Sequence, residues 1–292
     1  MEIINNLNFQ LNNSAVCIGK FDGIHQGHRM LLEKAQKSGY HTVMFTFVMN
    51  HIKQLYGVEE KHQLAQMLGI DVLIEIPFDE HFKNQSPEEF VRDILHKRCD
   101  AKLVVVGDDF RFGRERSGDV RTLKELGKVY GYETTEVKKV ISHGDVISST
   151  RIRNLVESGD VKQANALLGT PYFLFGEVQK GHQIGRKMST PTANIYPALD
   201  KVLPPYGVYA VLVDVDGKQY QGVGNLGRKP TIGDEEPLGL EVWLFDYDGN
   251  LYGKDILVYM IEYIREERKF DSIRQLQEQI ATDANRAKEI LS

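Results

Sequence analysis

The sequence predicts two domains of different fold class, an α/β domain over residues 1–169 and a predominantly β domain with a C-terminal helix over residues 170–292. In the first, short β-branched runs alternate with helical stretches, which is typical of a doubly wound parallel sheet. In the second, strands follow one another without intervening helices, which predicts an antiparallel barrel or sandwich. The pattern changes at Gly169-Thr170-Pro171. A length of 292 residues also fits about two domains.

The composition is that of an ordinary folded protein, with 41% hydrophobic and 26% charged residues. A net charge of -5 gives no electrostatic case for a nucleic-acid partner. No apolar run approaches the ~20 residues that span a bilayer, and the N-terminus lacks the pattern of a secretion signal. Cys17 and Cys99 have no metal-like spacing. We therefore expect a cytoplasmic protein that binds neither nucleic acid nor membrane, and the sequence does not indicate an oligomeric state.

The strands of the first domain are nearly continuous apolar runs, as expected for strands that are covered on both faces. They are predicted at 14–20, 41–47, 71–76, 102–107 and 132–137. The clearest helix start between them is Ser86, with Pro87 at the first helical position and Glu89 completing a capping box. Such sheets bind ligands at the carboxyl ends of their strands. The segments "GKFDGIHQGH" (19–28) and "GDDFRFG" (107–113) fall at these ends.

The second domain is predicted to contain five strands, at 173–179, 207–215, 218–226, 240–247 and 255–264. Asp216-Gly217 and Asp248-Gly249 are predicted to form hairpin turns. A helix over 272–291 closes the chain. Its apolar residues are predicted to share one face, and they are Ile273, Leu276, Ile280 and Ala287.

The segment 19–28 has the composition of a phosphate-binding turn. Gly19, Gly23 and Gly27 let backbone amides approach a bulky ligand. The following helix directs its N-terminal amides and positive dipole end to the same place. His25 and His28 add two donors, which suits the phosphates of a nucleotide. Two alternatives stay open: a plain glycine-rich turn, or a zinc pair, for which no third ligand is evident nearby.

The spacing H-x-G-H after an apolar strand resembles the nucleotidylyltransferase superfamily. The resemblance implies that this turn holds the triphosphate of ATP while another phosphate attacks the α-phosphorus. His25 and His28 then assist the reaction together with Mg²⁺. Gly19, Phe21 and Gly23 are the implied nucleotide contacts.

The segment "ISSTRIRNLVESGD" (147–160) resembles the serine/threonine-rich helix start of the same superfamily. Ser149 and Thr150 are natural helix-capping residues, and Arg153 lies one turn further, within reach of a phosphate. Standing alone, the segment would be interpreted as a helix cap. Beside H-x-G-H, the phosphate role is favoured.

The segment "VVVGDDFRFGRERSGD" (104–119) resembles the prokaryotic FAD synthetase family. There, the resemblance implies, this element lines the nucleotide pocket. Gly107 and Asp109 are the implied adenosine contacts, whereas Phe110 and Phe112 are expected in the core.

The second domain resembles riboflavin kinase in several long segments, in the order 181–197, 207–211, 222–233, 240–256 and 264–283. Over nearly its whole length the chain therefore resembles the bifunctional bacterial riboflavin kinase/FAD synthetase family. The resemblance implies two reactions. Riboflavin and ATP give FMN, and FMN and a second ATP give FAD and pyrophosphate.

The resemblance also implies the residues of the kinase site. Thr192 and Asn194 supply the oxygen ligands that Mg²⁺ takes, together with phosphate contacts. Gly181 and Gly185 flank a loop whose amides close over the phosphates. Glu241 is the base that accepts the proton of the riboflavin 5′-hydroxyl.

One departure from the family pattern leaves alternatives open. FAD synthetases follow the second strand with a proline–histidine–proline segment, whereas here Met49, Asn50 and His51 stand in "VMNHIKQLYG". The first alternative is a riboflavin kinase whose first domain binds ATP but does not adenylylate FMN productively. The others are a non-enzymatic flavin- or nucleotide-sensing protein, and a nucleotidylyltransferase for a different phosphate, which would leave the β domain unexplained.

Overall fold

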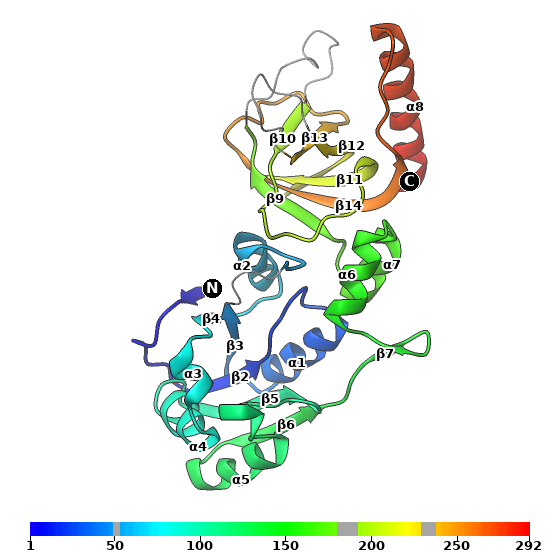
Figure 1. The fold of residues 1–292 in the computed structure, drawn as a ribbon. Coiled ribbons are helices and arrows are strands. Elements are labelled where there is room, and N and C mark those ends of the chain that lie inside the picture. Colours follow the sequence, from blue (N-terminus) through cyan, green and yellow to red (C-terminus); the bar gives the residue numbers. More distant parts are fainter. Residues whose placement is uncertain (49–52, 180–191, 229–237) are drawn as a thin grey trace. The chain divides into compact units, whose positions relative to one another are not determined.

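The computed structural model describes residues 1–48, 53–179, 192–228 and 238–292 (Figure 1). It divides into two compact units, Met1–Ile52 with Lys61–Ser149, and Lys53–Glu60 with Thr150–Ser292. We expected a boundary after Gly169. That boundary stays a prediction. The compact units divide after Ser149, and the short segment 53–60 belongs to the second unit.

The first unit contains a six-stranded parallel sheet in the order β1-β4-β3-β2-β5-β6. Its strands are β1 (Glu2–Ile4), β2 (Ser14–Ile18), β3 (His41–Val48), β4 (Val72–Pro77), β5 (Ala101–Gly107) and β6 (Glu133–Val137). All five predicted strands and the doubly wound fold are confirmed. Strand β1 was missed because it is three residues long and only Ile4 is buried, which leaves no readable pattern. The chain reverses its direction of winding between β2 and β5, where such sheets bind ligands.

From β2 onward, helices separate the successive strands. They are α1 (Gln26–Gln36), α2 (Val58–Met67), α3 (Glu80–Asn84), α4 (Pro87–Phe90), a π-helical continuation (Val91–His96), a 3-10 turn (Arg114–Arg116) and α5 (Val120–Tyr130). The capping box at Ser86 is confirmed, with Pro87 at the start and the Glu89 side chain returning to the Ser86 amide. All of β2 is buried, as expected for a strand covered on both faces.

The long segment of the second unit starts with α6 (Ser149–Glu157), whose first residue is grouped with the first unit, and continues with α7 (Val161–Leu168). An antiparallel sheet follows in the order β10-β13-β12-β11-β14-β9. Its strands are β9 (Phe173–Glu177), β10 (Thr192–Ile195), β11 (Gly207–Val215), β12 (Lys218–Arg228), β13 (Leu238–Leu244) and β14 (Asp255–Arg265). The two edges meet where the amide of Gln179 donates to the carbonyl of Asn194 at 2.9 Å. The sheet is therefore curled into a half-barrel, which confirms the predicted antiparallel β fold of this domain.

One of the two predicted hairpin turns is correct. Asp216 and Gly217 adopt left-handed φ angles of 53° and 78° and join β11 to β12. The prediction for Asp248-Gly249 was wrong. Strand β13 ends at Leu244 and pairs with β10 and β12, so it is not a neighbour of β14. The dipeptide lies in a longer connection, because a turn signal does not specify which strands it connects.

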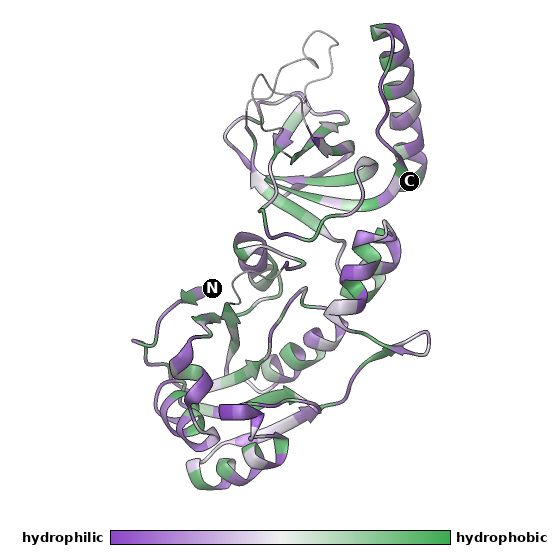
Figure 2. Cartoon of the chain, in the orientation of Figure 1, coloured by the Kyte–Doolittle hydropathy of each residue, from purple (hydrophilic) through white to green (hydrophobic). Residues whose placement is uncertain are grey.

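Helix α8 (Ile273–Leu291) begins after the predicted cap Ser272. Its predicted apolar face was wrong at Ile273, which is 71% exposed, whereas Leu276 and Ile280 are half-buried and Ala287 is buried. Ala284 and Ala287 pack on the sheet in a cluster with Ala210 and Phe245, and Ile290 and Leu291 pack against the same cluster. Most of α8 is hydrophilic, whereas apolar residues follow β11 and β14 (Figure 2). Within the described ranges, no helix is both long enough and apolar enough to cross a membrane.

Candidate functional site

The predicted phosphate-binding turn follows β2, at the point in the sheet where the order of strand addition reverses between β2 and β5. The Gly19 amide donates to the Phe45 carbonyl at 3.2 Å, which holds the turn against the end of β3. Phe21, Gly23 and Ile24 all adopt left-handed backbone angles, with φ of 45°, 89° and 38°. Such angles are unusual for phenylalanine and isoleucine. Both side chains are completely buried, and this burial holds the turn in shape.

The two histidines form one stacked unit at the start of α1. The rings of His25 and His28 lie 3.8 Å apart between centroids, with an interplanar angle of 14°. His25 caps the helix, because its Nδ1 accepts the amide of His28 at 3.4 Å. A Cβ atom on Gly27 would lie 3.2 Å from the ring of His25. The glycine between the histidines is thus what leaves room for the stack.

Burial keeps both imidazoles neutral. It lowers the pKa of His25 to about 4. Burial, and then the neighbouring His25, also lower the pKa of His28 well below the ordinary value. Since Nδ1 of His25 accepts a hydrogen bond, the proton of this ring is assigned to Nε2. Nδ1 of His28 is buried and has no hydrogen-bond partner in the described part of the chain. Two neutral rings can donate to an anion without repelling each other.

Ser149 is brought to this turn, since its hydroxyl donates to the carbonyl of Asp22 at 2.7 Å. Thr150 and Arg153 belong to the second unit. There the guanidinium of Arg153 donates to the Thr150 hydroxyl at 3.2 Å and to the Lys53 carbonyl at 3.4 Å. Their phosphate contacts stay a prediction.

Gly107 stands beside the turn at the end of the neighbouring strand. Cys17 pairs with Val105, so Gly19 and Gly107 each lie two positions beyond this pair. Asp109 follows in the loop, where its carboxylate pairs with Lys139 at 2.8 Å.

The aromatic residues of the loop after β5 lie where the sequence predicted them. Phe112 is buried in the core, and Phe110 packs against the same cluster. Their rings stack with centroids 5.6 Å apart.

An aromatic group at the ends of β3 and β4 was not predicted from the sequence. The ring of Phe47 lies 5.1 Å from that of Phe78 and 5.3 Å from that of Phe82. Phe78 is 47% exposed although it is a large apolar side chain. The signal was present in the sequence, because Phe78 follows the carboxyl end of a predicted strand, where ligands bind. Met49, Asn50 and His51 lie outside the described residues.

In the second unit, three predicted residues come together on adjacent strands. Asn194 of β10 pairs directly with Glu241 of β13. The hydroxyl of Thr192 donates to the Glu241 carboxylate at 2.6 Å. Asn194 is 4% exposed, whereas Thr192 and Glu241 are half-buried. Gly181 and Gly185 lie outside the described residues.

The donors of this group are hydroxyl, amide and carboxylate oxygens, which are the ligands that Mg²⁺ prefers. Such sites use few protein ligands and leave the remaining positions to water and phosphate. Among the described residues, no three His, Cys, Asp or Glu side chains gather in a way that would hold a metal ion. The histidine pair therefore has no third zinc ligand of these types in those ranges.

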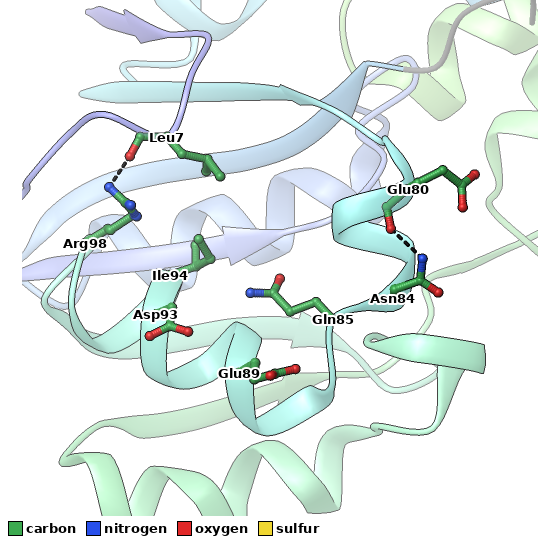
Figure 3. Close-up of a pocket in the computed structure, with 8 residues that line it drawn as sticks. All are labelled: Leu7, Glu80, Asn84, Gln85, Glu89, Asp93, Ile94 and Arg98. Atoms are coloured by element: carbon green, nitrogen blue, oxygen red, sulfur yellow. Dashed lines mark hydrogen bonds between the residues drawn. The ribbon is translucent and has the colours of Figure 1, made fainter.

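A pocket of about 630 Å³ lies elsewhere in the first unit (Figure 3). It is lined by Leu7, Glu80, Asn84, Gln85, Glu89, Asp93, Ile94 and Arg98. The Arg98 guanidinium donates to the carbonyl of Leu7, and the Asn84 amide donates to that of Glu80 at 2.8 Å (Figure 3). None of the predicted site residues lines this pocket.

Comparisons with known proteins cover both units. A riboflavin kinase family model matches residues 168–291, and an FAD synthetase family model matches residues 8–151. Three relatives are each named bifunctional riboflavin kinase/FMN adenylyltransferase. The one from Buchnera aphidicola (subsp. Schizaphis graminum) is 37% identical over 96% of this chain and 95% of its own length. Those from Escherichia coli K12 and Bacillus subtilis 168 are 36% and 35% identical, over 93% and 94% of this chain and 91% of each relative.

A solved structure from Streptococcus pneumoniae has a similar fold along the whole chain. It is titled a macrolide-efflux protein, is 30% identical, and covers 96% of both chains with a TM-score of 0.82. With relatives more than 30% identical over nearly its full length, this chain belongs to the bifunctional riboflavin kinase/FMN adenylyltransferase family.

Proposed function

We propose that this protein phosphorylates riboflavin to FMN in its second unit and adenylylates FMN to FAD in its first unit, with ATP as the donor in both reactions. The observation that carries the kinase assignment is the 2.6 Å hydrogen bond from Thr192 to Glu241, with Asn194 directly opposite Glu241. A base and two oxygen ligands on adjacent strands suit transfer of a phosphoryl group to a hydroxyl.

In the kinase reaction, the 5′-hydroxyl of riboflavin attacks the γ-phosphorus of ATP. Glu241 accepts the proton of this hydroxyl, and the Thr192 hydroxyl fixes the direction in which the carboxylate points. Thr192 and Asn194 would hold Mg²⁺, which when bound offsets the negative charge of the phosphates. Gly181 and Gly185 are proposed to close a loop over the phosphates.

In the adenylyl reaction, a phosphate oxygen of FMN attacks the α-phosphorus of ATP and pyrophosphate leaves. The attacking oxygen is already an anion, so no base is needed. The amides of the turn at Gly19, Phe21 and Gly23, together with the N–H groups of His25 and His28, stabilise the charge that develops on the phosphate. Ser149, Thr150 and Arg153 are proposed as further phosphate contacts. Gly107 and Asp109 are proposed as adenosine contacts.

The exposed ring of Phe78, supported edge-on by Phe47, supplies an aromatic surface at the carboxyl end of the same sheet. Flat conjugated rings stack favourably on such a surface. We therefore propose that the isoalloxazine of FMN lies there. This surface supports the bifunctional assignment over a kinase with a merely ATP-binding first unit.

The assignment is tested by incubating the protein with riboflavin, ATP and Mg²⁺, and separately with FMN, ATP and Mg²⁺, and separating the flavins by chromatography. We expect FMN, together with FAD made from it, in the first incubation and FAD in the second. Glu241→Gln should abolish FMN formation and keep FAD formation, whereas His28→Asn should do the reverse. Formation of FMN without any FAD would restrict the function to riboflavin kinase. Loss of both activities in each variant would contradict the two-site assignment.

We also propose a cytoplasmic location, because the reactions consume ATP and because Cys17 and Cys99 are both free and buried.

A further inference from the structure

Asn225 is a polar residue next to the proposed base that the proposed reactions do not use. It lies on β12 directly opposite Glu241 of β13. Residues paired in this way point to the same face, with Cβ atoms about 5 Å apart. The Asn225 Nδ2 donates to a carboxylate oxygen of Glu267 at 2.9 Å. Its Oδ1 is buried and has no hydrogen-bond partner in the part of the chain that the structure describes.

The contact with Glu267 fixes which end of the Asn225 amide faces which way. An ionised carboxylate can only accept hydrogen bonds, so the NH₂ group must face Glu267 and the oxygen must face away from it. The buried oxygen is therefore an acceptor that a hydrogen-bond donor of a ligand can reach. A buried polar atom without a partner is costly and is uncommon in native proteins.

Two features hold Glu267 in this position. Gly227, two residues beyond Asn225 on β12, has no side chain, and a Cβ atom there would overlap the Glu267 carboxylate. Arg265, at the end of β14, binds the buried carboxylate of Asp283 through both its Nε and Nη2 atoms, at 2.9 and 2.7 Å. The start of the segment that carries Glu267 is thereby anchored to α8.

We propose that Oδ1 of Asn225 accepts a hydrogen bond from a secondary hydroxyl of the riboflavin ribityl chain, and that Glu267 is a positioning residue that holds the amide in this orientation. This inference rests on the proposed kinase function. The ribityl chain carries hydroxyl donors close to the 5′-hydroxyl that Glu241 receives, whereas the phosphates of ATP offer only acceptors. Asn225 then contributes to recognition of the flavin substrate and not to the transfer step.

The first test compares the kinase kinetics of Asn225→Leu with those of wild type. Losing one neutral hydrogen bond is expected to raise the KM for riboflavin about three- to tenfold, with kcat and the KM for ATP unchanged. Gln219→Leu is the matched control, because Gln219 is an exposed amide on the same strand, and its kinetics should equal those of wild type.

A second test asks whether Glu267 sets the orientation of the Asn225 amide. Glu267→Lys places a group that only donates beside Asn225, so the amide must reverse and present NH₂ to the substrate. The KM for riboflavin should rise as in Asn225→Leu, and the two substitutions together should have no larger effect than either alone. Glu267→Gln keeps an accepting oxygen and should stay close to wild type.

Riboflavin analogues without the 2′-, the 3′- or the 4′-hydroxyl identify the donor. Wild type should lose affinity for one of them by the same factor that Asn225→Leu loses for riboflavin, and Asn225→Leu should not distinguish that analogue from riboflavin. An unchanged riboflavin KM in Asn225→Leu, or a rise in the KM for ATP instead, would overturn the proposal. Failure of wild type to form any FMN would overturn the kinase function itself, so the two failures are distinct.

Discussion

The ammonium group of Lys201 donates to the carboxylate of Glu60 at 2.6 Å, and the two side chains are 0% and 6% exposed. The same ammonium group donates to the Leu55 carbonyl at 2.9 Å and lies 4.7 and 4.4 Å from the ring centroids of Tyr56 and Tyr172. Glu60 also accepts the amide of Phe175 at 3.1 Å. A charged pair with this many partners fastens the segment 53–60 into the second unit.

Removing one member of this pair should destabilise the second unit strongly. Lys201→Met leaves the Glu60 carboxylate buried without its cation, which is expected to cost about 3–5 kcal/mol. The double variant with Glu60→Gln should regain part of this loss, because no charge is then left unpaired. Urea unfolding followed by the fluorescence of Trp243, the only tryptophan of the chain, measures the effect. A cost below about 1 kcal/mol would indicate a hydrated, surface-like pair.

The histidine pair should make the first unit sensitive to acid. The pKa of His25 is about 4 in the folded protein and ~6.5 in an unfolded chain. The unfolded state therefore binds the proton first, and stability present above pH ~6.5 is lost as the pH falls towards 4. Between pH 7 and pH 5 the loss should be about 1–2 kcal/mol.

His25→Asn keeps a side-chain oxygen for the helix cap and removes the titrating group. Its calorimetric unfolding curve should depend less on pH over this range than that of wild type. Equal pH dependence in both proteins would contradict the assignment of a neutral, buried imidazole.

Gly27→Ala should lower the rate of adenylyl transfer without lowering the stability of the first unit. Alanine is a better helix former than glycine in α1, so the folded state should not be weakened. The added Cβ would lie 3.2 Å from the His25 ring, so this ring must move by a few tenths of an ångström against His28. We expect the rate of FAD formation from FMN to fall about tenfold or more, while FMN formation from riboflavin is unchanged. A full rate of FAD formation would show that the stack is not used in the reaction.

The two halves of α8 should respond differently to the same substitution. Ala287→Asp buries a carboxylate against Ala210 and Phe245, which should lower the free energy of unfolding by several kcal/mol. Ile273→Asp lies at a 71% exposed position and should change the free energy of unfolding by less than about 0.5 kcal/mol. Trp243 packs at the same cluster, so its fluorescence during urea unfolding reports both variants. Similar costs at the two positions would mean that the first half of α8 is also covered in solution.

Local patterns predicted most of the fold. The apolar runs located five strands of each sheet, and the capping box at Ser86 located a helix start. These signals depend on neighbours in the sequence. The hairpin prediction at Asp248-Gly249 was wrong because residues distant in the sequence decide which strands pair. The predicted burial of Ile273 was wrong because helical periodicity does not indicate how far the partner sheet extends along the helix.

The site was predictable in its residue types and not in its contacts. A glycine between two histidines indicated a close approach, but the stacking of the two rings required the left-handed turn before them. Asn225 was missed because its meaning depends on cross-strand register with Glu241 and on Glu267, which lies far along the chain. Resemblance located Thr192 and Glu241, and only the folded sheet places them in hydrogen-bonding contact.

The segment 53–60 has a consequence for dissecting this protein. Because it is encoded in the first half and packs in the second unit, no single cut of the gene yields two products that each contain a whole compact unit. A kinase fragment beginning at residue 150 would present the Lys201 ammonium to an empty groove, and would need residues 53–60 fused to it or added as a free peptide, as in split-protein complementation.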